Sequence, residues 1–195
     1  MNGMSTRKKL LVTLGVMALM GLGVFGTFAA FTATTTNSGN EIDSGSVKID
    51  DDSGATTELY DVTNQKPGDS TSACLRIKYN GSLNAAVKLY MSAGVTNGTM
   101  YNLQVERGSG LTTVDNTRSC AGFSSSSTVY NGNLGSFATT YAGGYDGKAG
   151  GAAWAQNDAV DYRFTITQND DATANAHTAV TSSGPHSFTW EARNN

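Results

Sequence analysis

Two histidines, His177 and His186, are the residues best suited to acid–base or zinc chemistry in this sequence. Neither belongs to a His-Glu-x-x-His motif, the helical spacing with which a zinc protease holds its metal. The sequence also lacks a Gly-x-Ser-x-Gly motif, which would present a serine nucleophile on a strained turn. We therefore predict no catalytic residue, no metal ligand and no cofactor, with His186 as a polar residue at a strand end and His177 in a loop.

Acidic residues are the second group that could bind an ion. Asp50, Asp51 and Asp52 are adjacent, whereas a calcium loop takes its ligands from alternate positions. We expect a solvated turn at these three residues, with metal binding by the turn as the open alternative. Two further acidic pairs are also expected to be solvated, Asp158 with Asp161 and Asp170 with Asp171.

The N-terminal segment has the three parts of a secretory signal peptide. Arg7, Lys8 and Lys9 form a basic head, and the next stretch, residues 10–31, has no charge. Small residues then stand three positions and one position before a cut that follows Ala29. We predict cleavage between Ala29 and Ala30, which gives a signal peptide (1–29), a mature N-terminal segment (30–43) and a folded domain (44–195).

A permanent membrane anchor is the alternative for the same segment. The apolar run is long enough to cross a bilayer, which takes about 20 residues. No basic cluster follows the run as a stop signal. Four glycines also weaken a stable helix towards the C-terminal end of the run: Gly15, Gly21, Gly23 and Gly26. Under either interpretation the rest of the chain lies outside the cytoplasm, secreted into a matrix or held at the cell surface.

The composition of the exported part favours a β-rich domain and disfavours nucleic acid as a partner. The chain has 13 basic and 16 acidic residues, and residues 1–29 hold three of the basic and none of the acidic ones, so the mature chain has a net charge of −6. An acidic chain without a basic patch has no electrostatic reason to bind nucleic acid. Many Gly, Ser, Thr and Asn residues and only two prolines are typical of an all-β extracellular domain with many turns.

Both cysteines, Cys74 and Cys120, lie in the exported part. A single pair in an oxidising compartment predicts one disulfide. Two free thiols in a reducing niche are the alternative. A metal site is disfavoured because neither cysteine has a second Cys or His at ligand spacing.

Alternating apolar and polar residues predict the strands of the domain. After a turn at Lys66-Pro67-Gly68-Asp69, one strand over residues 73–79 has an apolar face and carries Cys74 on its other face. The same pattern predicts strands over residues 46–49, 85–91, 101–105, 159–167 and 186–192. The Gly-, Ser- and Thr-rich middle, residues 108–151, is expected to hold short strands and large loops.

The register around Asn80-Gly81 argues against a two-residue hairpin. Such a loop would place Tyr79 opposite Ser82, and the apolar residues Val87 and Leu89 would then point away from the core. A strand that crosses from one sheet to another resolves the conflict most simply, and this favours an antiparallel β-sandwich.

Several stretches occur together in an order that resembles the TasA/camelysin family of bacterial exported proteins. They are an aromatic-Ala-Ala-Phe junction at residues 28–31, a small-Gly strand at residues 44–49, the Lys-Pro-Gly-Asp turn at residues 66–69, the Asn-Gly-Ser-Leu corner at residues 80–83, and a final "SFTWEA". The resemblance covers the N-terminal half and the last strand, whereas the Gly/Ser-rich middle and the cysteine pair depart from the family pattern.

This resemblance implies a jelly-roll-like β-sandwich that is processed by a signal peptidase of the SipW type. It also implies fibres of a biofilm matrix or cell surface that form by donor-strand exchange, most simply between copies of one chain. The donor would be an uncharged, β-prone stretch at the mature N-terminus: Ala30, Phe31, Thr32, Ala33, Thr34, Thr35 and Thr36.

Three other interpretations stay open from the sequence. The donor segment could dock on its own sandwich. The protein could be a cell-surface metalloprotease, as some camelysin relatives are described, although the sequence offers no recognisable zinc set. It could also be a non-polymerising surface-binding module, for which exposed aromatic residues in the middle would be the sign: Tyr130, Tyr141, Tyr145 and Trp154.

Overall fold

The computed structural model describes residues 45–51, 58–60, 65–91, 94–170 and 182–194. The chain divides into two units, Met1–Asp43 and Ser44–Asn195, and all the described residues belong to the second. The architecture below is therefore that of the second unit.

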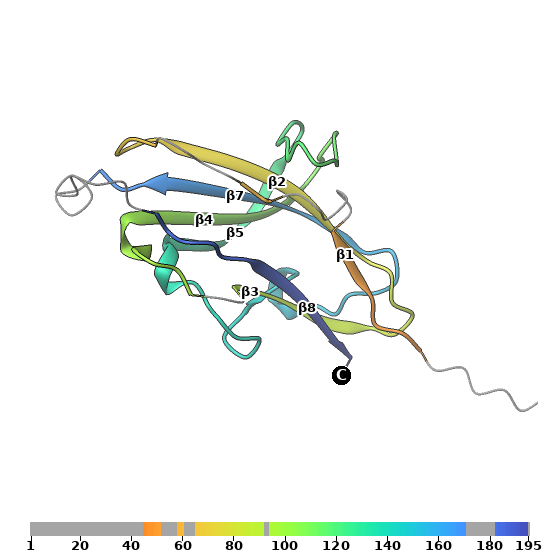
Figure 1. Ribbon diagram of the computed structural model, residues 1–195. Helices are drawn as coiled ribbons and strands as arrows, with labels where there is room; N and C mark the ends of the chain where they lie inside the picture. The colour runs from red at the N-terminus through yellow and green to blue at the C-terminus, as the bar shows by residue number, and fades with distance from the viewer. Residues whose placement is uncertain (1–44, 52–57, 61–64, 92–93, 171–181, 195) are drawn as a thin grey trace, which may run out of the picture. The chain divides into compact units, whose positions relative to one another are not determined.

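In the described residues, eight strands form two antiparallel sheets that pack face to face (Figure 1). The larger sheet has the order β1-β2-β7-β4-β5 and the smaller sheet has the order β6-β3-β8. The described residues contain no α-helix, so the predicted all-β, antiparallel sandwich is confirmed. The strands are β1 (Ile49–Asp51), β2 (Ser70–Tyr79), β3 (Ala85–Met91), β4 (Tyr101–Ser109), β5 (Ser124–Asn133), β6 (Tyr145–Asp146), β7 (Ala159–Gln168) and β8 (Phe188–Asn194).

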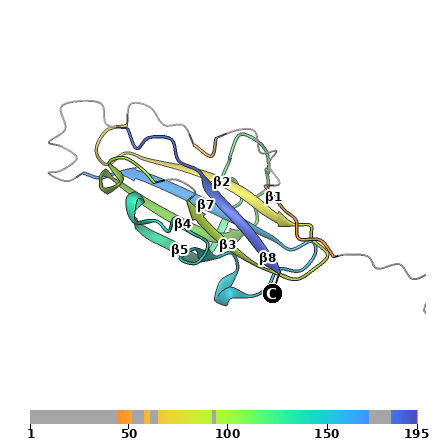
Figure 2. The same ribbon diagram turned by 60° about the horizontal axis from the view of Figure 1, so that its bottom comes forward.

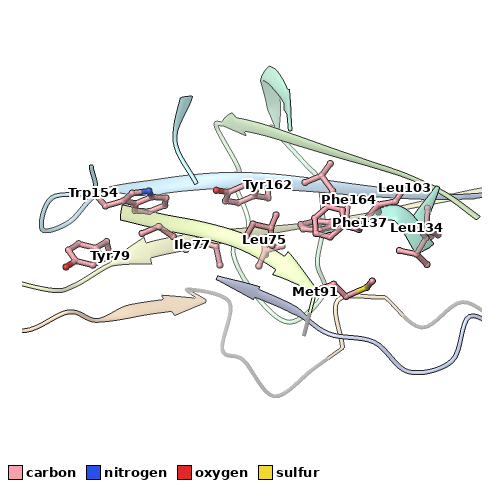
Figure 3. Packing of buried hydrophobic residues seen from close by; sticks show 14 of the residues in the cluster. Leu75, Ile77, Tyr79, Met91, Leu103, Leu134, Phe137, Trp154, Tyr162 and Phe164 are labelled. Atoms are coloured by element: carbon pink, nitrogen blue, oxygen red, sulfur yellow. The ribbon is translucent and has the colours of Figure 1, made fainter. Parts of the chain in front are cut away.

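The core lies between the sheets and is built from alternate residues of the central strands (Figure 3). Side chains of a strand point to opposite faces in turn, so one apolar residue in two suffices to line a core. In β2 and β3 these residues are fully buried: Ala73, Leu75, Ile77 and Tyr79, then Ala85, Val87, Leu89 and Met91. Tyr162, Phe164 and Ile166 of β7, the neighbour of β2 in the large sheet, are buried on the same side of that sheet, as the apolar pattern predicted.

The corner between β2 and β3 confirms the prediction that the chain changes sheets there. β2 belongs to the five-stranded sheet and β3 to the three-stranded sheet, where it runs beside β8 (Figure 2). The N–H groups of Asn80 and Gly81 donate to the carbonyl of Lys48, not to a hairpin partner. The hydroxyl of buried Tyr79 donates to the carbonyl of Leu83 and fixes the corner from inside.

The turn at residues 66–69 has the predicted chemistry. The N–H of Asp69 donates to the carbonyl of Lys66 at 2.9 Å, and the Asp69 carboxylate accepts from the N–H of Lys66 at 2.9 Å. Gly68 has φ 88°, a conformation that costs little without a Cβ.

Two predicted elements need correction. The first strand is Ile49–Asp51 rather than residues 46–49, because Asp50 and Asp51 pair with β2 and do not form a solvated turn. The middle of the chain holds a ten-residue strand, β5, where short strands were expected. Because β5 is an edge strand that is largely exposed on one face, its sequence SSSSTVYNGN shows little apolar alternation.

Candidate functional site: outer face and edges of the sandwich

The outer face of the large sheet carries a buried ion pair. Arg76 of β2 and Asp161 of β7 are directly opposed, and the guanidinium makes two contacts with the carboxylate, at 2.6 and 2.9 Å. Asp161 is only 2% exposed, because the chain at Leu111 lies over it and donates its N–H to the same carboxylate at 2.9 Å. The prediction that Asp161 is solvated is therefore wrong. Asp158 is also engaged, in an ion pair with Lys148.

The cysteine pair fastens this covering loop to β2. The sulfur atoms of Cys74 and Cys120 lie 2.17 Å apart, at disulfide distance, as the sequence predicted. Cys74 faces away from the core but is 2% exposed, because the loop covers it and the carbonyl of Arg118 accepts its N–H at 2.9 Å. Such a bridge, which closes a loop of 46 residues, stabilises a fold by roughly 3–4 kcal/mol on the chain-entropy model.

The aspartates of β1 are bound to separate partners. Asp50 accepts from the Asn80 amide at 2.6 Å and lies 3.3 Å from the Lys48 ammonium. The hydrogen bond from Asn80, with help from Lys48, lowers the pKa of Asp50 despite some desolvation. Asp51 instead binds Arg118 at 2.9 Å. In the part of the chain that the structure describes, no three His, Cys, Asp or Glu side chains lie close enough to hold a metal, and Asp52 lies outside that part.

His186 lies two residues before β8, which begins at Phe188 and not at the predicted residue 186, and it is held from both ring nitrogens. Its Nε2 is 2.6 Å from the hydroxyl of Tyr60, and its Nδ1 is 3.0 Å from the carbonyl of Gly184. Burial raises the pKa of the Tyr60 hydroxyl. These contacts of the imidazole hold the segment before β8 against Tyr60. His177 lies outside the described residues.

The aromatic residues of the middle are structural rather than a surface cluster. Trp154 is completely buried in the core. Tyr130 and Tyr145 are partly buried and pack on the buried ring of Phe137, with ring centroids 5.0 and 4.8 Å from it. Tyr141 lies under the guanidinium of Arg193, 3.8 Å from ring centre to Cζ. These four residues therefore do not form the exposed platform that a surface-binding module would use.

The four sheet edges differ in how well they are protected against an added strand. β1 is short and carries two aspartates, and β5 is polar and interrupted by two register shifts. Short, charged or bulged strands are the usual protection of an edge. On the β6 side, irregular chain occupies the edge of β3, because main-chain bonds join Val87 to Gly147 and Ala85 to Trp154. β8 has seven residues and pairs with β3 alone among the described strands.

The predicted cleavage and donor residues lie outside the described part of the chain. These are Ala29 and Ala30 for the cut, and Ala30, Phe31, Thr32, Ala33, Thr34, Thr35 and Thr36 for the donor strand. Among the helical segments of the described residues, none is long and apolar enough to span a membrane. Neither the family models nor the curated proteins compared with this sequence give a match.

The edge of β8 is the feature that sequence patterns missed. The alternation in "SFTWEA" predicts a strand, but the pattern does not say whether that strand is central or at an edge. A partial signal was available in the charged residues Glu191 and Arg193 beside the aromatic ones, because charge on the outer face is common on exposed edges.

Proposed function

We propose that this protein is an exported structural subunit that assembles into extracellular or cell-surface fibres by donor-strand exchange. The mature N-terminal segment, Ala30–Thr36, adds as a strand to a sheet of the next copy. The observation that carries the proposal is a sandwich whose seven-residue edge strand, β8, pairs with β3 alone among the described strands, preceded in the same chain by an uncharged β-prone segment. The ordered motifs shared with the TasA/camelysin family support the same function.

The chemistry of this assembly is a main-chain ladder. A ladder uses the backbone N–H and C=O groups of the added strand, so most side chains of the segment matter little to affinity. Phe31 is the exception, because it is the one large apolar side chain between Ala30 and Thr36, and burying it contributes roughly 1.5–3 kcal/mol. A head-to-tail contact that does not close into a ring generates an open filament.

Electron microscopy of the purified mature protein tests the proposal. The intact mature chain should form fibres, whereas a chain that lacks residues 30–36 should stay a folded monomer. Near-ultraviolet circular dichroism of the deleted chain checks that the sandwich is intact. Fibres from the deleted chain at the same concentration would refute donor-strand assembly, and loss of the fold would show that the segment belongs to its own sandwich.

Export by signal-peptide cleavage is part of the same proposal, with a signal peptidase of the SipW type as the partner. Intact-mass measurement of the exported chain should give a first residue of Ala30. A mature chain that still carries residues 10–28 would instead show a permanent anchor.

A further inference from the structure

The main chain of β8 presents one complete row of hydrogen-bonding groups away from β3. In β3, Ala85 and Val87 bond to the β6 side, so the alternate residues Ala86, Lys88 and Tyr90 bond to β8. Opposed residues of an antiparallel pair exchange both bonds or neither. The partners that exchange bonds are Arg193, Glu191 and Thr189.

Phe188, Trp190 and Ala192 of β8 alternate with these residues and consequently point their N–H and C=O groups outward. Within the described ranges these groups have no main-chain partner. Their spacing, every second residue over one strand, is the pattern to which a further antiparallel strand would bond.

The core is less well covered along β8 than along β3. The core-facing residues of β3 are all buried, whereas Phe188, Trp190 and Ala192 of β8 are only partly buried. Phe188 and Trp190 nevertheless pack on Phe164 of the opposite sheet, with ring centroids 4.6 and 5.8 Å away. Apolar side chains in the core layer thus end at an edge where a further strand would bury them.

We propose that the outer edge of β8 is the acceptor site for the N-terminal segment Ala30–Thr36 of a second copy of this chain, bound antiparallel to β8. This inference rests on the proposed fibre function and assigns the acceptor within it. The added strand extends the small sheet from three strands to four and covers Phe188, Trp190 and Ala192.

The position at which the described chain begins favours a second copy as the source. Ser46 accepts the N–H of Leu83, which precedes β3 at the end where Ala85 pairs with Asn194 of β8. A segment of the same chain that ran along the edge of β8 directly into this corner would have the same direction as β8 and would therefore be parallel to it. An antiparallel strand from the same chain would need residues 37–44 to run back along all of β8, whereas a segment from another copy does not have this constraint.

The residue pattern of the segment suits this site. Phe31 and Ala33 share one face of a strand, and Thr32 and Thr34 share the other. With Phe31 towards the core, the threonines stand on the outer face beside Thr189 and Glu191. Glu191 is already bound to Arg193 at 2.7 Å and to Tyr90 at 2.7 Å, so an uncharged strand leaves that pairing undisturbed.

Cross-linking between two chains, each with one added cysteine beside the native Cys74–Cys120 pair, tests the site. One mature chain carries Thr189→Cys on β8, and three others carry Thr32→Cys, Thr34→Cys or Thr36→Cys to cover alternative registers. Directly opposed residues have Cβ atoms about 4.5–5.5 Å apart, so mixed oxidised fibres should contain a covalent dimer for at least one pair. Asn131→Cys on the edge of β5 is the matched acceptor control and should give none.

The possible outcomes test the assignment of β8 as acceptor separately from the proposal that the protein forms fibres. Fibres that form without any Thr189→Cys cross-link would overturn the β8 assignment and leave the fibre function standing. A cross-link within one chain that carries both added cysteines, and none between mixed chains, would show that the segment docks on its own sandwich. That result would overturn the proposal that the segment comes from a second copy. Wild-type mature chains that form no fibres would refute the proposed function and this inference together.

Proline substitution gives an independent measurement. Ala192→Pro removes an N–H that points away from β3, so the domain should fold, as edge strands tolerate such a proline, and fibres should be lost. Asn131→Pro removes an outward N–H from the edge of β5 and should leave fibre formation unchanged. Normal fibres from Ala192→Pro, or lost fibres from a folded Asn131→Pro, would overturn the choice of edge.

Discussion

Arg76 and Asp161 illustrate how single residues hold the outer layer of this domain. Each is an ordinary strand residue on the face away from the core, yet together they bind the chain at Leu111 through its N–H and its carbonyl. The loop that Cys120 anchors is therefore fixed at two points, by a covalent bond and by a buried charge pair. Loss of either charge leaves the other without its main partner under that loop.

Replacing Arg76 by methionine should destabilise the domain strongly. The apolar stem of the side chain is kept, while the buried carboxylate of Asp161 loses its main counter-ion, which costs about 3–5 kcal/mol for a buried pair. Urea unfolding of the monomer measures the change. The control is Lys48→Met, which removes the exposed cation beside Asp50 and should change the unfolding free energy by less than about 1 kcal/mol. Equal effects of the two substitutions would contradict the burial argument.

Two buried tyrosines predict a loss of stability in alkali. Burial raises the pKa of Tyr60 and of Tyr162 above the ordinary value of 10.0. Above pH 10 the unfolded chain therefore ionises these groups while the folded chain does not. Their contribution to stability is complete below pH 10 and falls as pH rises further.

Unfolding free energies measured across this pH range test the tyrosine prediction. Tyr60→Phe and Tyr162→Phe should each make stability fall less steeply above pH 10 than in the wild type. An unchanged slope in both variants would mean that these hydroxyls do not carry the alkaline transition.

At the residue scale, sequence spacing was a poor guide to charge. Asp158 and Asp161 look like a solvated pair because they are close in sequence, but their partners are Lys148 on one side and Arg76 on the other. Arg76 is 85 positions from Asp161, and only strand pairing brings them together. The cysteines were predictable because one pair allows one bridge.

At the scale of elements, the corner after β2 decides the architecture. The conflict between a short hairpin and the apolar register of β3 forces the chain to leave one sheet for the other. At Gly81 the corner packs tightly against its neighbours. A Cβ atom added there would lie 2.4 Å from the Tyr79 hydroxyl and 2.6 Å from the Ser46 carbonyl. The corner therefore leaves no space for a side chain at this position.

Gly81→Ala should destabilise the domain by about 1–3 kcal/mol, the usual cost of forcing extra volume into a packed site. Thermal unfolding of the monomer measures this cost. Gly94→Ala is the matched control, since nothing lies within 4 Å of the added Cβ there, and it should be neutral or slightly stabilising. A neutral Gly81→Ala would show that the corner can open without cost.

The central strands were predictable from sequence, whereas the edge strands β1 and β5 were not. β2, β3 and β7 bury one face completely, so their apolar residues alternate clearly. β5 has little to bury on either face. β1 is defined by the main-chain pairing of Ile49, Asp50 and Asp51 with β2 and has no alternating apolar pattern. Periodicity reports burial, and an edge strand that buries little leaves a weak signal.

At the scale of the whole molecule, the sandwich has unequal sheets and an edge strand, β8, that pairs with β3 alone among the described strands. Five strands face three, and the core-facing residues of β8 stay partly exposed. The sequence alone supplied the candidate donor, residues 30–36, and the fold supplied a candidate acceptor. The donor segment does not identify the acceptor edge, and the acceptor edge does not identify the donor. Their pairing depends on how two copies of the chain are placed relative to each other.

A proline within the donor segment is the most direct test of strand exchange. Thr34→Pro removes one ladder N–H and leaves the sandwich domain untouched, while Asn40→Pro places the same residue in the connection outside the segment. Light scattering and electron microscopy of both mature chains follow fibre growth. The account predicts fibres from Asn40→Pro and only folded monomers from Thr34→Pro, and fibres from Thr34→Pro at the wild-type concentration would contradict it.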